Sequence, residues 1–289
     1  MKILLVGASG LLGSEFRALL SADAYYAPSS SEMDIRDVTA IERYCADKPD
    51  ISAVINCAAS RDAEYLEDHE TIAREINVIA ARELALFSKR ANIPLIHFSS
   101  DYVFDGRKNT PYLEGDVTNP LSVYGRTKLD GEIAVLENST TCLCIRIAWV
   151  FSVYGKDFVK TIIANGTKRD ELKVVFDQVG SPTHGQDIAR AVLDILPKIR
   201  NGTRAVYHLT NEGVCSWYDL AWTIVRHAGL SCKVTPIHSS EYLLRSPRPS
   251  YSVLDKGKIK RDFGLNLRHW SEALSDCITL VRARTSLLD

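Results

Sequence analysis

The sequence predicts an α/β fold, in which a doubly wound parallel sheet is followed by a smaller C-terminal lobe. Short apolar stretches suited to buried strands alternate with amphipathic stretches suited to helices as far as about residue 149. A glycine-rich turn joins the first expected strand to the first expected helix. Beyond this region the alternation weakens, and the 289 residues of the chain suffice for two lobes.

The first strand is expected at residues 2–6, and three glycines follow it with the spacing Gly-x-x-Gly-x-x-Gly: Gly7, Gly10 and Gly13. Glycines at this spacing allow a tight turn, a close approach of the backbone to a pyrophosphate, and close packing of helix on strand. The N–H groups at the start of the next helix would bind the phosphates. The motif therefore predicts a Rossmann-type dinucleotide-binding domain.

The end of the second expected strand, residues 24–27, bears on which dinucleotide is bound. Folds that prefer NAD place an acidic residue there to bind the ribose hydroxyls. Here Pro28 and three serines follow, and no acid occurs before Glu32 and Asp34. This absence permits a 2′-phosphate, so we expect NADPH without excluding NADH. Asp34 and Ile35 are expected beside the adenine.

Further strands and helices alternate along the chain: a helix over 37–47, a strand over 54–59, a helix over 71–91 and a strand over 95–98. Ligands of open α/β sheets bind at the carboxyl ends of the strands. Small residues end the third strand there, as a cofactor across the strand ends requires, although tight packing would also explain them: Ala58, Ala59 and Ser60. The fourth strand leads into Ser100 and Asp101, which could bind a substrate carbonyl and sugar hydroxyls. A turn cap is the alternative role for Asp101.

A helix is expected to begin near residue 121, and it places Tyr124 and Lys128 one turn apart on one face. A free tyrosine, with a pKa near ~10, is a poor acid–base catalyst at neutral pH. An ammonium group one turn away should stabilise the phenolate and lower that pKa. The spacing alone occurs far more often by chance, in two solvated residues on a helix. Together with the glycine turn and Ser100 it predicts a catalytic pair.

The fifth strand, residues 142–148, ends in Trp149, which we expect to pack at the edge of the core and to stack on a substrate. We assign residues 1–149 to the dinucleotide-binding domain, with a return segment at about 184–212, and residues 150–289 mainly to a substrate-binding lobe. The later elements are expected as a helix over 158–164, a strand over 172–176, a loop over 177–183, a helix over 187–199, a strand over 205–209, a helix over 216–228, a strand over 233–237 and a helix over 270–284.

The composition argues against several classes of protein. A formal net charge of -1 gives no overall basic field for nucleic acid or an anionic membrane. No apolar stretch approaches a membrane span, and the first one passes directly into the glycine turn instead of a signal-peptide cleavage site. The seven cysteines show neither zinc nor Cys-x-x-Cys spacing, which favours a reduced, cytoplasmic protein.

These motifs resemble the extended short-chain dehydrogenase/reductases and, more narrowly, the dTDP-4-dehydrorhamnose reductases. The resemblance implies that Tyr124 donates a proton, that Lys128 binds the nicotinamide ribose, and that Ser100 orients the carbonyl. The narrower family commonly has threonine in place of Ser100, so the hydroxyl is retained. The stretches that carry the narrower resemblance span nearly the whole chain: residues 97–106, 111–114, 124–132, 146–149, 180–183, 207–211, 216–218 and 248–254.

The resemblance implies reduction of the C4 ketone of dTDP-4-dehydro-L-rhamnose by NAD(P)H. The sugar nucleotide is expected to contact Ser100, Asp101 and Trp149. Arg248 is expected to bind its diphosphate, with a structural ion pair as the alternative. The cofactor is expected along Gly7, Gly10, Leu11, Leu12, Gly13, Asp34, Ile35, Ala58, Ala59, Ser60, Phe98, Tyr124 and Lys128.

Two other functions stay open. The β subunit of methionine adenosyltransferase, a catalytically silent NADP-binding regulatory protein, shares much of the stretch at 124–132. A reductase or epimerase of another nucleotide sugar would keep the same tyrosine and lysine. Trp149 and the stretch at 207–218 favour the first interpretation.

Some members of the resembled family form a dimer through a metal ion held by glutamates. Glu15 stands at one such position, Gln186 replaces a second, and the C-terminal residues 286–289 offer no clear third. We therefore expect no structural Mg²⁺, and we leave both a monomer and a homodimer open.

Overall fold

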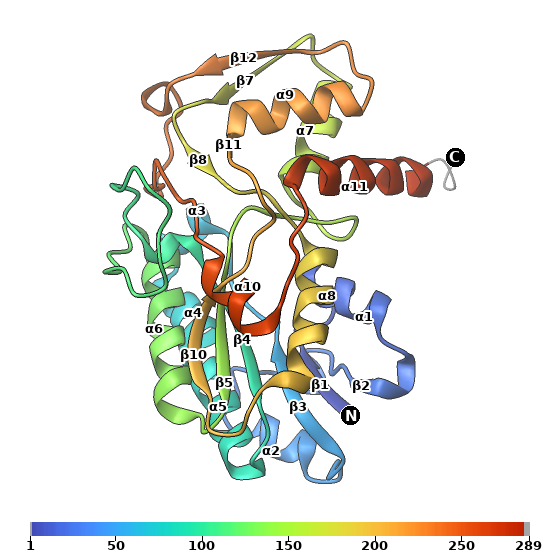
Figure 1. The fold of residues 1–289 in the computed structure, drawn as a ribbon, viewed down its shortest axis with the longest axis vertical. Coiled ribbons are helices and arrows are strands. Elements are labelled where there is room, and N and C mark those ends of the chain that lie inside the picture. The colour runs from blue at the N-terminus through green and yellow to red at the C-terminus, as the bar shows by residue number, and fades with distance from the viewer. Residues whose placement is uncertain (1, 286–289) are drawn as a thin grey trace.

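The fold is taken from a computed structural model that describes residues 2–285; Met1 and residues 286–289 lie outside the described part. A six-stranded sheet forms one end of the molecule, the lower part of Figure 1, and all its strand pairs are parallel. From edge to edge its strands are β10 (Arg204–His208), β5 (Cys142–Ile147), β4 (Leu95–Ser100), β3 (Ile51–Asn56), β1 (Lys2–Val6) and β2 (Tyr25–Tyr26).

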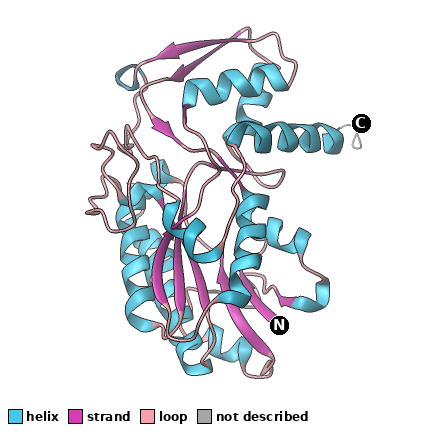
Figure 2. Cartoon of the chain, in the orientation of Figure 1, coloured by secondary structure: helices cyan, strands magenta, loops and turns pink. Residues whose placement is uncertain are grey.

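Helices cover both faces of this sheet (Figure 2). The side chains of β5 alternate between the two faces: Leu143 and Ile145 join the core under α1 and α8, whereas Cys142 and Cys144 join the core under α2, α5 and α6. The predicted doubly wound α/β fold is therefore confirmed. The covering helices are α1 (Leu11–Leu19) and α8 (Gly185–Ile195) on one face, and α2 (Ala40–Cys45), α4 (Glu70–Arg74), α5 (Ala80–Ala91) and α6 (Val123–Asn138) on the other.

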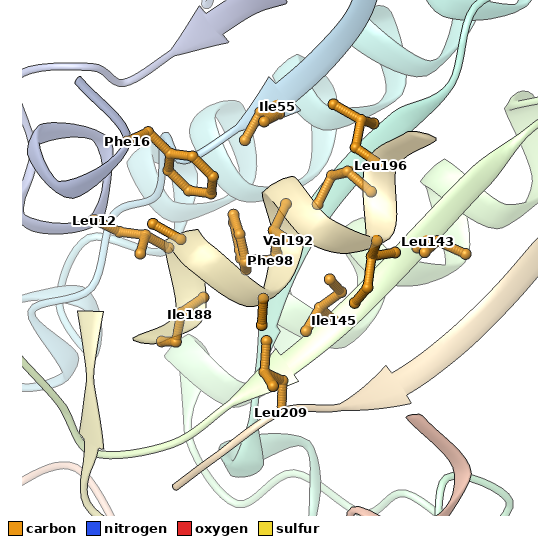
Figure 3. Close-up of a cluster of buried hydrophobic side chains, with 14 of the residues drawn as sticks. Leu12, Phe16, Ile55, Phe98, Leu143, Ile145, Ile188, Val192, Leu196 and Leu209 are labelled. Carbon is orange, nitrogen blue, oxygen red and sulfur yellow. The ribbon is translucent and has the colours of Figure 1, made fainter. Parts of the chain in front are cut away.

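The core under α1 and α8 includes residues near the carboxyl end of β4. Figure 3 shows Phe16 of α1 and Val192 of α8 beside Phe98 of β4. The rings of Phe16 and Phe98 lie 6.1 Å apart and are tilted by 46°. Close-packed protein interiors have low compressibility. This packing therefore restricts movement of β4, which carries Phe98.

A smaller lobe lies above the sheet in Figure 1 and has its own apolar core. Its helices α7, α9 and α11 pack around two short strand pairs, of which β7 and β12 are parallel and β8 and β11 antiparallel. The elements are α7 (Phe158–Gly166), β7 (Glu171–Val175), β8 (Val179–Gly180), β11 (Cys215–Ser216), α9 (Trp217–His227), β12 (Lys233–Ile237) and α11 (Trp270–Thr285).

The chain passes between the two parts several times. It leaves the sheet after β5, and β6 (Val150–Phe151) pairs with β9 (Thr183–His184) where it returns to form α8 and β10. A further helix, α10 (Gly257–Phe263), packs on β10. The two parts are therefore joined by several segments of the chain.

The structure differs from the expected elements in several places. β3 was expected at 54–59 but spans Ile51–Asn56, and just beyond its end the glycine turn lies against the backbone of Ala58. Residues 177–183 were expected as a loop but contain β8. The helix expected over 187–199 ends at Ile195, since Pro197 follows within a 3₁₀ turn. α10 was not expected at all. Within residues 2–285, no helix is both long and apolar enough to cross a membrane.

Candidate active site

A cavity of about 680 Å³ lies where the carboxyl ends of β3, β4 and β5 meet the smaller lobe. Most of the residues that the sequence singled out line it together: Gly10, Leu11, Leu12, Ala58, Ala59, Phe98, Ser100, Asp101, Tyr124, Lys128, Trp149 and Arg248. The remaining ones do not line it: Gly7, Gly13, Asp34, Ile35 and Ser60. A single cavity therefore contains both the proposed catalytic groups and the glycine turn.

The glycine turn has the geometry of a phosphate cradle. Gly7 has φ 73°, and a Cβ there would lie 2.6 Å from the Ala58 nitrogen, while a Cβ at Gly13 would lie 2.3 Å from the Gly7 oxygen. Gly7 and Gly13 allow the close backbone contacts within the turn and do not line the cavity. Gly10 is the N-cap residue of α1, a helix whose N-terminus has no side-chain cap and no acidic residue in its first turn. The uncapped N–H groups and the helix dipole fit a pyrophosphate.

Asn77, which the sequence analysis missed, connects the end of β3 to α6. It lies buried in a π-helical segment, Glu75–Ile79, between α4 and α5. Its Oδ1 accepts a hydrogen bond from the Ser60 nitrogen at 2.9 Å, and its Nδ2 donates to the Ser60 oxygen and to Thr127 Oγ1, each at 3.1 Å. A polar residue within an apolar helical pattern was the available signal. Ser60 thus supports the site without lining it.

The start of α6 fixes the predicted tyrosine and lysine. Ser122 caps the helix by accepting a hydrogen bond from the Gly125 nitrogen at 3.1 Å. Lys128 is only 2% exposed, and its Nζ donates to the Phe98 carbonyl oxygen at 2.6 Å. Burial lowers the pKa of Lys128 to about 8, and Glu132 works against this shift.

The expected lowering of the Tyr124 pKa is wrong. Burial raises the pKa of Tyr124 to about 12; a hydrogen bond with Ser100 opposes this shift, and the charge of Asp101 adds to it. Burial is the larger effect because the phenolate would lose its hydration. The ammonium group of Lys128 is directed at the Phe98 carbonyl. Tyr124 is therefore held in its protonated form.

Ser100 and Asp101 stand at the end of β4 as expected. Ser100 Oγ accepts from the Tyr102 nitrogen at 3.2 Å and donates to Asp101 Oδ1 at 2.9 Å. Burial raises the pKa of Asp101 to about 6, against the side chains of Ser252 and Ser100. Asp101 Oδ2 is buried without a hydrogen-bond partner among the described residues. A carboxylate oxygen in that state would be stabilised by a ligand hydroxyl.

The smaller lobe contributes two aromatic rings that the sequence analysis did not single out, those of Trp217 and Phe158. Trp217 stacks on the predicted Trp149, with ring centroids 3.6 Å apart and planes 8° apart, and Phe158 packs against Trp217 at 4.5 Å. All three residues line the cavity. An aromatic at the start of a helix gives no sequence signal of its own, since such residues usually belong to the core.

Arg248 lies at the cavity with an imperfect partner. Its Nη2 is 3.7 Å from Glu64 Oε1, and its Nε is buried without a partner among the described residues. Arg61 and Lys156 line the same cavity and were also missed. The lining thus carries basic side chains suited to an anion.

Asp34 lies outside the cavity. It forms hydrogen bonds with Arg36, which lower its pKa to about 2. Ile35 packs against the core beside α2 and α5. Contact of either residue with an adenine stays a prediction.

Glu15 is buried and accepts a hydrogen bond from Ser152 Oγ. Burial raises its pKa. Within residues 2–285, no group of three or more histidine, cysteine, aspartate or glutamate side chains could hold a metal ion. The third position that the sequence analysis considered, residues 286–289, lies outside the described part.

Comparisons with known proteins agree on one family. A family model described as RmlD substrate binding domain matches residues 1–283. A dTDP-4-dehydrorhamnose reductase of Burkholderia thailandensis is 35% identical and is aligned over 96% of this chain and 98% of its own. A crystal structure of a dTDP-4-dehydrorhamnose reductase from Clostridium acetobutylicum superposes with a TM-score of 0.92, at 37% identity over 98% of this chain and 100% of that one. One from Bacillus anthracis, in complex with NADP, has a TM-score of 0.91 at 29% identity, over 96% and 98% of the two chains.

Proposed function

The chain belongs to the RmlD substrate binding domain family, and from this we propose that it reduces the C4 ketone of dTDP-4-dehydro-L-rhamnose with NADPH to give dTDP-L-rhamnose. It is then an oxidoreductase of nucleotide-sugar biosynthesis. The observation that carries the proposal is the convergence of Ser100, Tyr124 and Lys128 in the cavity that the glycine turn also lines. NADPH is the expected cofactor, since a relative of the same fold is described with NADP.

The protein's part in the reaction is to hold a proton donor and orient the ketone. NADPH, when bound, supplies the hydride to C4. Tyr124 donates the proton from its hydroxyl to the oxygen that becomes an alkoxide, and its raised pKa keeps that proton in place at neutral pH. Ser100 Oγ, held by the Tyr102 nitrogen, would turn its hydrogen from Asp101 Oδ1 to the same oxygen when the ketone binds.

Lys128 and Asp101 act beside these groups. Lys128 lines the same cavity with a buried ammonium group, which would bind ribose hydroxyls of the cofactor and add positive charge to the site. Asp101 binds sugar hydroxyls through its unpartnered Oδ2. Arg248 binds the diphosphate of the sugar nucleotide, and the incoming anion would replace its distant contact with Glu64.

We also keep the division of labour along the chain as a proposal. Residues 1–149, together with the return segment at 184–212, bind the cofactor, and residues 150–289 mainly bind the sugar nucleotide. In support, the return segment contributes β10 to the large sheet and α8 to the helices that cover one of its faces. Trp149 lies at the boundary, at the end of β5. The protein is proposed to act in the cytoplasm, as a monomer or a homodimer.

The test is the identity of the product. The protein is incubated with NADPH and dTDP-4-dehydro-L-rhamnose, and the sugar nucleotide is analysed by NMR. Conversion to dTDP-L-rhamnose with equal consumption of NADPH is expected. Binding of NADPH without turnover would support a regulatory subunit, and turnover of only another 4-keto sugar nucleotide would support the remaining alternative.

A further inference from the structure

Trp149 has a backbone conformation that tryptophan rarely adopts. Its φ is 48°, and among the described residues the only other non-glycine residue with a positive φ is Asn92, which follows α5. Asparagine tolerates this region of φ/ψ space, whereas a bulky residue there is an outlier. Such conformations persist where the surroundings over-determine them, and they cluster at ligand sites. The conformation of Trp149 therefore depends on the contacts that hold it.

Two contacts hold the indole of Trp149. One face lies on Trp217, at 3.6 Å between ring centroids and 8° between planes. Gly180 lies against the ring, because a Cβ at that position would be 2.5 Å from Trp149 Cε2 and 2.6 Å from Nε1. The Trp149 carbonyl oxygen also accepts a hydrogen bond from the Thr183 nitrogen at 3.1 Å. Without Trp217, one whole face of the indole would be unsupported.

Trp217 is itself firmly placed. It is the first residue of α9, and Ser216 caps that helix in a capping box with Asp219. Phe158 of α7 packs against its ring at 4.5 Å with the planes inclined by 58°. A side chain fixed by a capped helix start and a neighbouring ring can impose its orientation on Trp149.

We propose that Trp217 is a positioning residue, which holds the indole of Trp149 in the cavity so that it meets the sugar nucleotide in one orientation. The inference rests on the proposed function. The glycine turn, Tyr124 and Lys128 come from other elements of the cavity. Loss of Trp217 should therefore weaken the binding of the sugar nucleotide and leave NADPH binding unchanged.

The chain offers a matched control on the same helix. Trp222 lies five residues later on α9, is 48% exposed, and contacts Arg226 instead of the cavity. Trp217→Leu and Trp222→Leu thus remove the same side chain from the same helix. Trp217→Phe keeps an aromatic face against Trp149.

The first readout is circular dichroism in the far ultraviolet, without any ligand. Two stacked indoles couple their transitions and give a couplet of bands where the transition dipoles within the two ring planes are skewed. Trp217→Leu should change the spectrum by losing this coupling, and Trp222→Leu should leave the coupled bands as in the wild-type protein. Coupled bands of equal size in Trp217→Leu and the wild-type protein would overturn the proposed stack.

The second readout is the dissociation constant of dTDP-L-rhamnose, and separately of NADPH, by calorimetry. Trp217→Leu should bind dTDP-L-rhamnose roughly tenfold more weakly, a size typical of an aromatic pair, and Trp217→Phe should recover most of the loss. Equal affinity in Trp217→Leu, an equal loss in Trp222→Leu, or no binding by the wild-type protein would contradict the proposal. A wild-type protein that binds both compounds but turns nothing over would contradict the reductase function and leave the positioning role standing.

Discussion

The Nζ atom of Lys128 donates a hydrogen bond to the carbonyl oxygen of Phe98 at 2.6 Å and so ties α6 to the end of β4. The partner is a neutral carbonyl, not a carboxylate. Among residues 2–285, the buried ammonium has no charged partner within hydrogen-bonding distance, and burial lowers its pKa to about 8.

The pKa of Lys128 predicts how kcat/KM for NADPH depends on pH in the alkaline range. Lys128 carries its charge below about pH 8 and loses it above, whereas Tyr124, with a pKa of about 12, stays protonated throughout. We expect kcat/KM for NADPH, which reports the free enzyme, to fall as the pH rises through about 8. Lys128→Met should be slower and lack this limb. The same limb in Lys128→Met would assign the ionisation to another group.

A second prediction concerns the cost of keeping Asp101 buried. Its pKa is about 6 in the folded protein against a usual value of 3.8, so the folded state binds more protons between these pH values and stability falls as the pH rises through them. Asp101→Asn should therefore raise the free energy of unfolding by up to about 3 kcal/mol at neutral pH. The difference should shrink toward pH 4. Urea denaturation at several pH values measures it.

The control for this prediction is Asp130→Asn. Asp130 lies on the surface of α6 in an exposed pair with Arg74, so its replacement should change stability little. A gain of stability that does not depend on pH would argue against a buried carboxylate as the cause.

The pair of Arg146 and Glu132 behind Lys128 is a third case. Its two hydrogen bonds measure 2.6 and 3.0 Å, and the side chains are 4% and 3% exposed. Arg146→Met alone should cost about 3–5 kcal/mol, because it leaves a buried carboxylate uncompensated. Combined with Glu132→Leu, much of that loss should return. Chemical denaturation measures both.

The exposed pair of Arg74 and Asp130, at 2.9 Å, supplies the comparison. Arg74→Met should cost less than about 1 kcal/mol. Equal losses at the two pairs would show that burial does not govern the energy of the Arg146 pair.

Two substitutions in the glycine turn should have different effects, one on folding and the other on cofactor binding. A Cβ at Gly13 would lie 2.3 Å from the Gly7 oxygen, so Gly13→Ala should lower the melting temperature. At Gly10 the nearest atom would be 3.3 Å away, so Gly10→Ala should fold and bind NADPH roughly tenfold more weakly. Gly115→Ala, which points into open space, is the control for both. Unchanged NADPH affinity in Gly10→Ala would remove the turn from the binding site.

The sequence predicted the sheet well because each strand carries a local signal. Apolar stretches bounded by turns mark β1, β4 and β5, and the motif at Gly7 marks the cofactor end. The end of β3 was placed three residues late. Ala58 continues the apolar pattern, and only the approach of Gly7, more than fifty residues away in the chain, shows that the strand has already ended.

The parts of the site that were missed depend on tertiary contacts. Asn77 forms hydrogen bonds with Ser60 and Thr127, and Trp217 stacks on Trp149. These partners are far apart in the sequence, so the periodicity of apolar residues does not reveal the contacts. The pKa of Tyr124 was wrong because helical spacing shows that Lys128 is near but not how completely both groups are buried.

The central claim is that Tyr124 is the proton donor of a ketone reduction. The most direct test is the rate of NADPH oxidation with dTDP-4-dehydro-L-rhamnose in the wild-type protein, in Tyr124→Phe and in Tyr102→Phe, whose ring packs edge-on against Tyr124 at 5.5 Å. We expect Tyr124→Phe to lose about two to three orders of magnitude in kcat with an unchanged melting temperature, and Tyr102→Phe to lose far less. Tyr124→Phe turning over at close to the wild-type rate would contradict the claim.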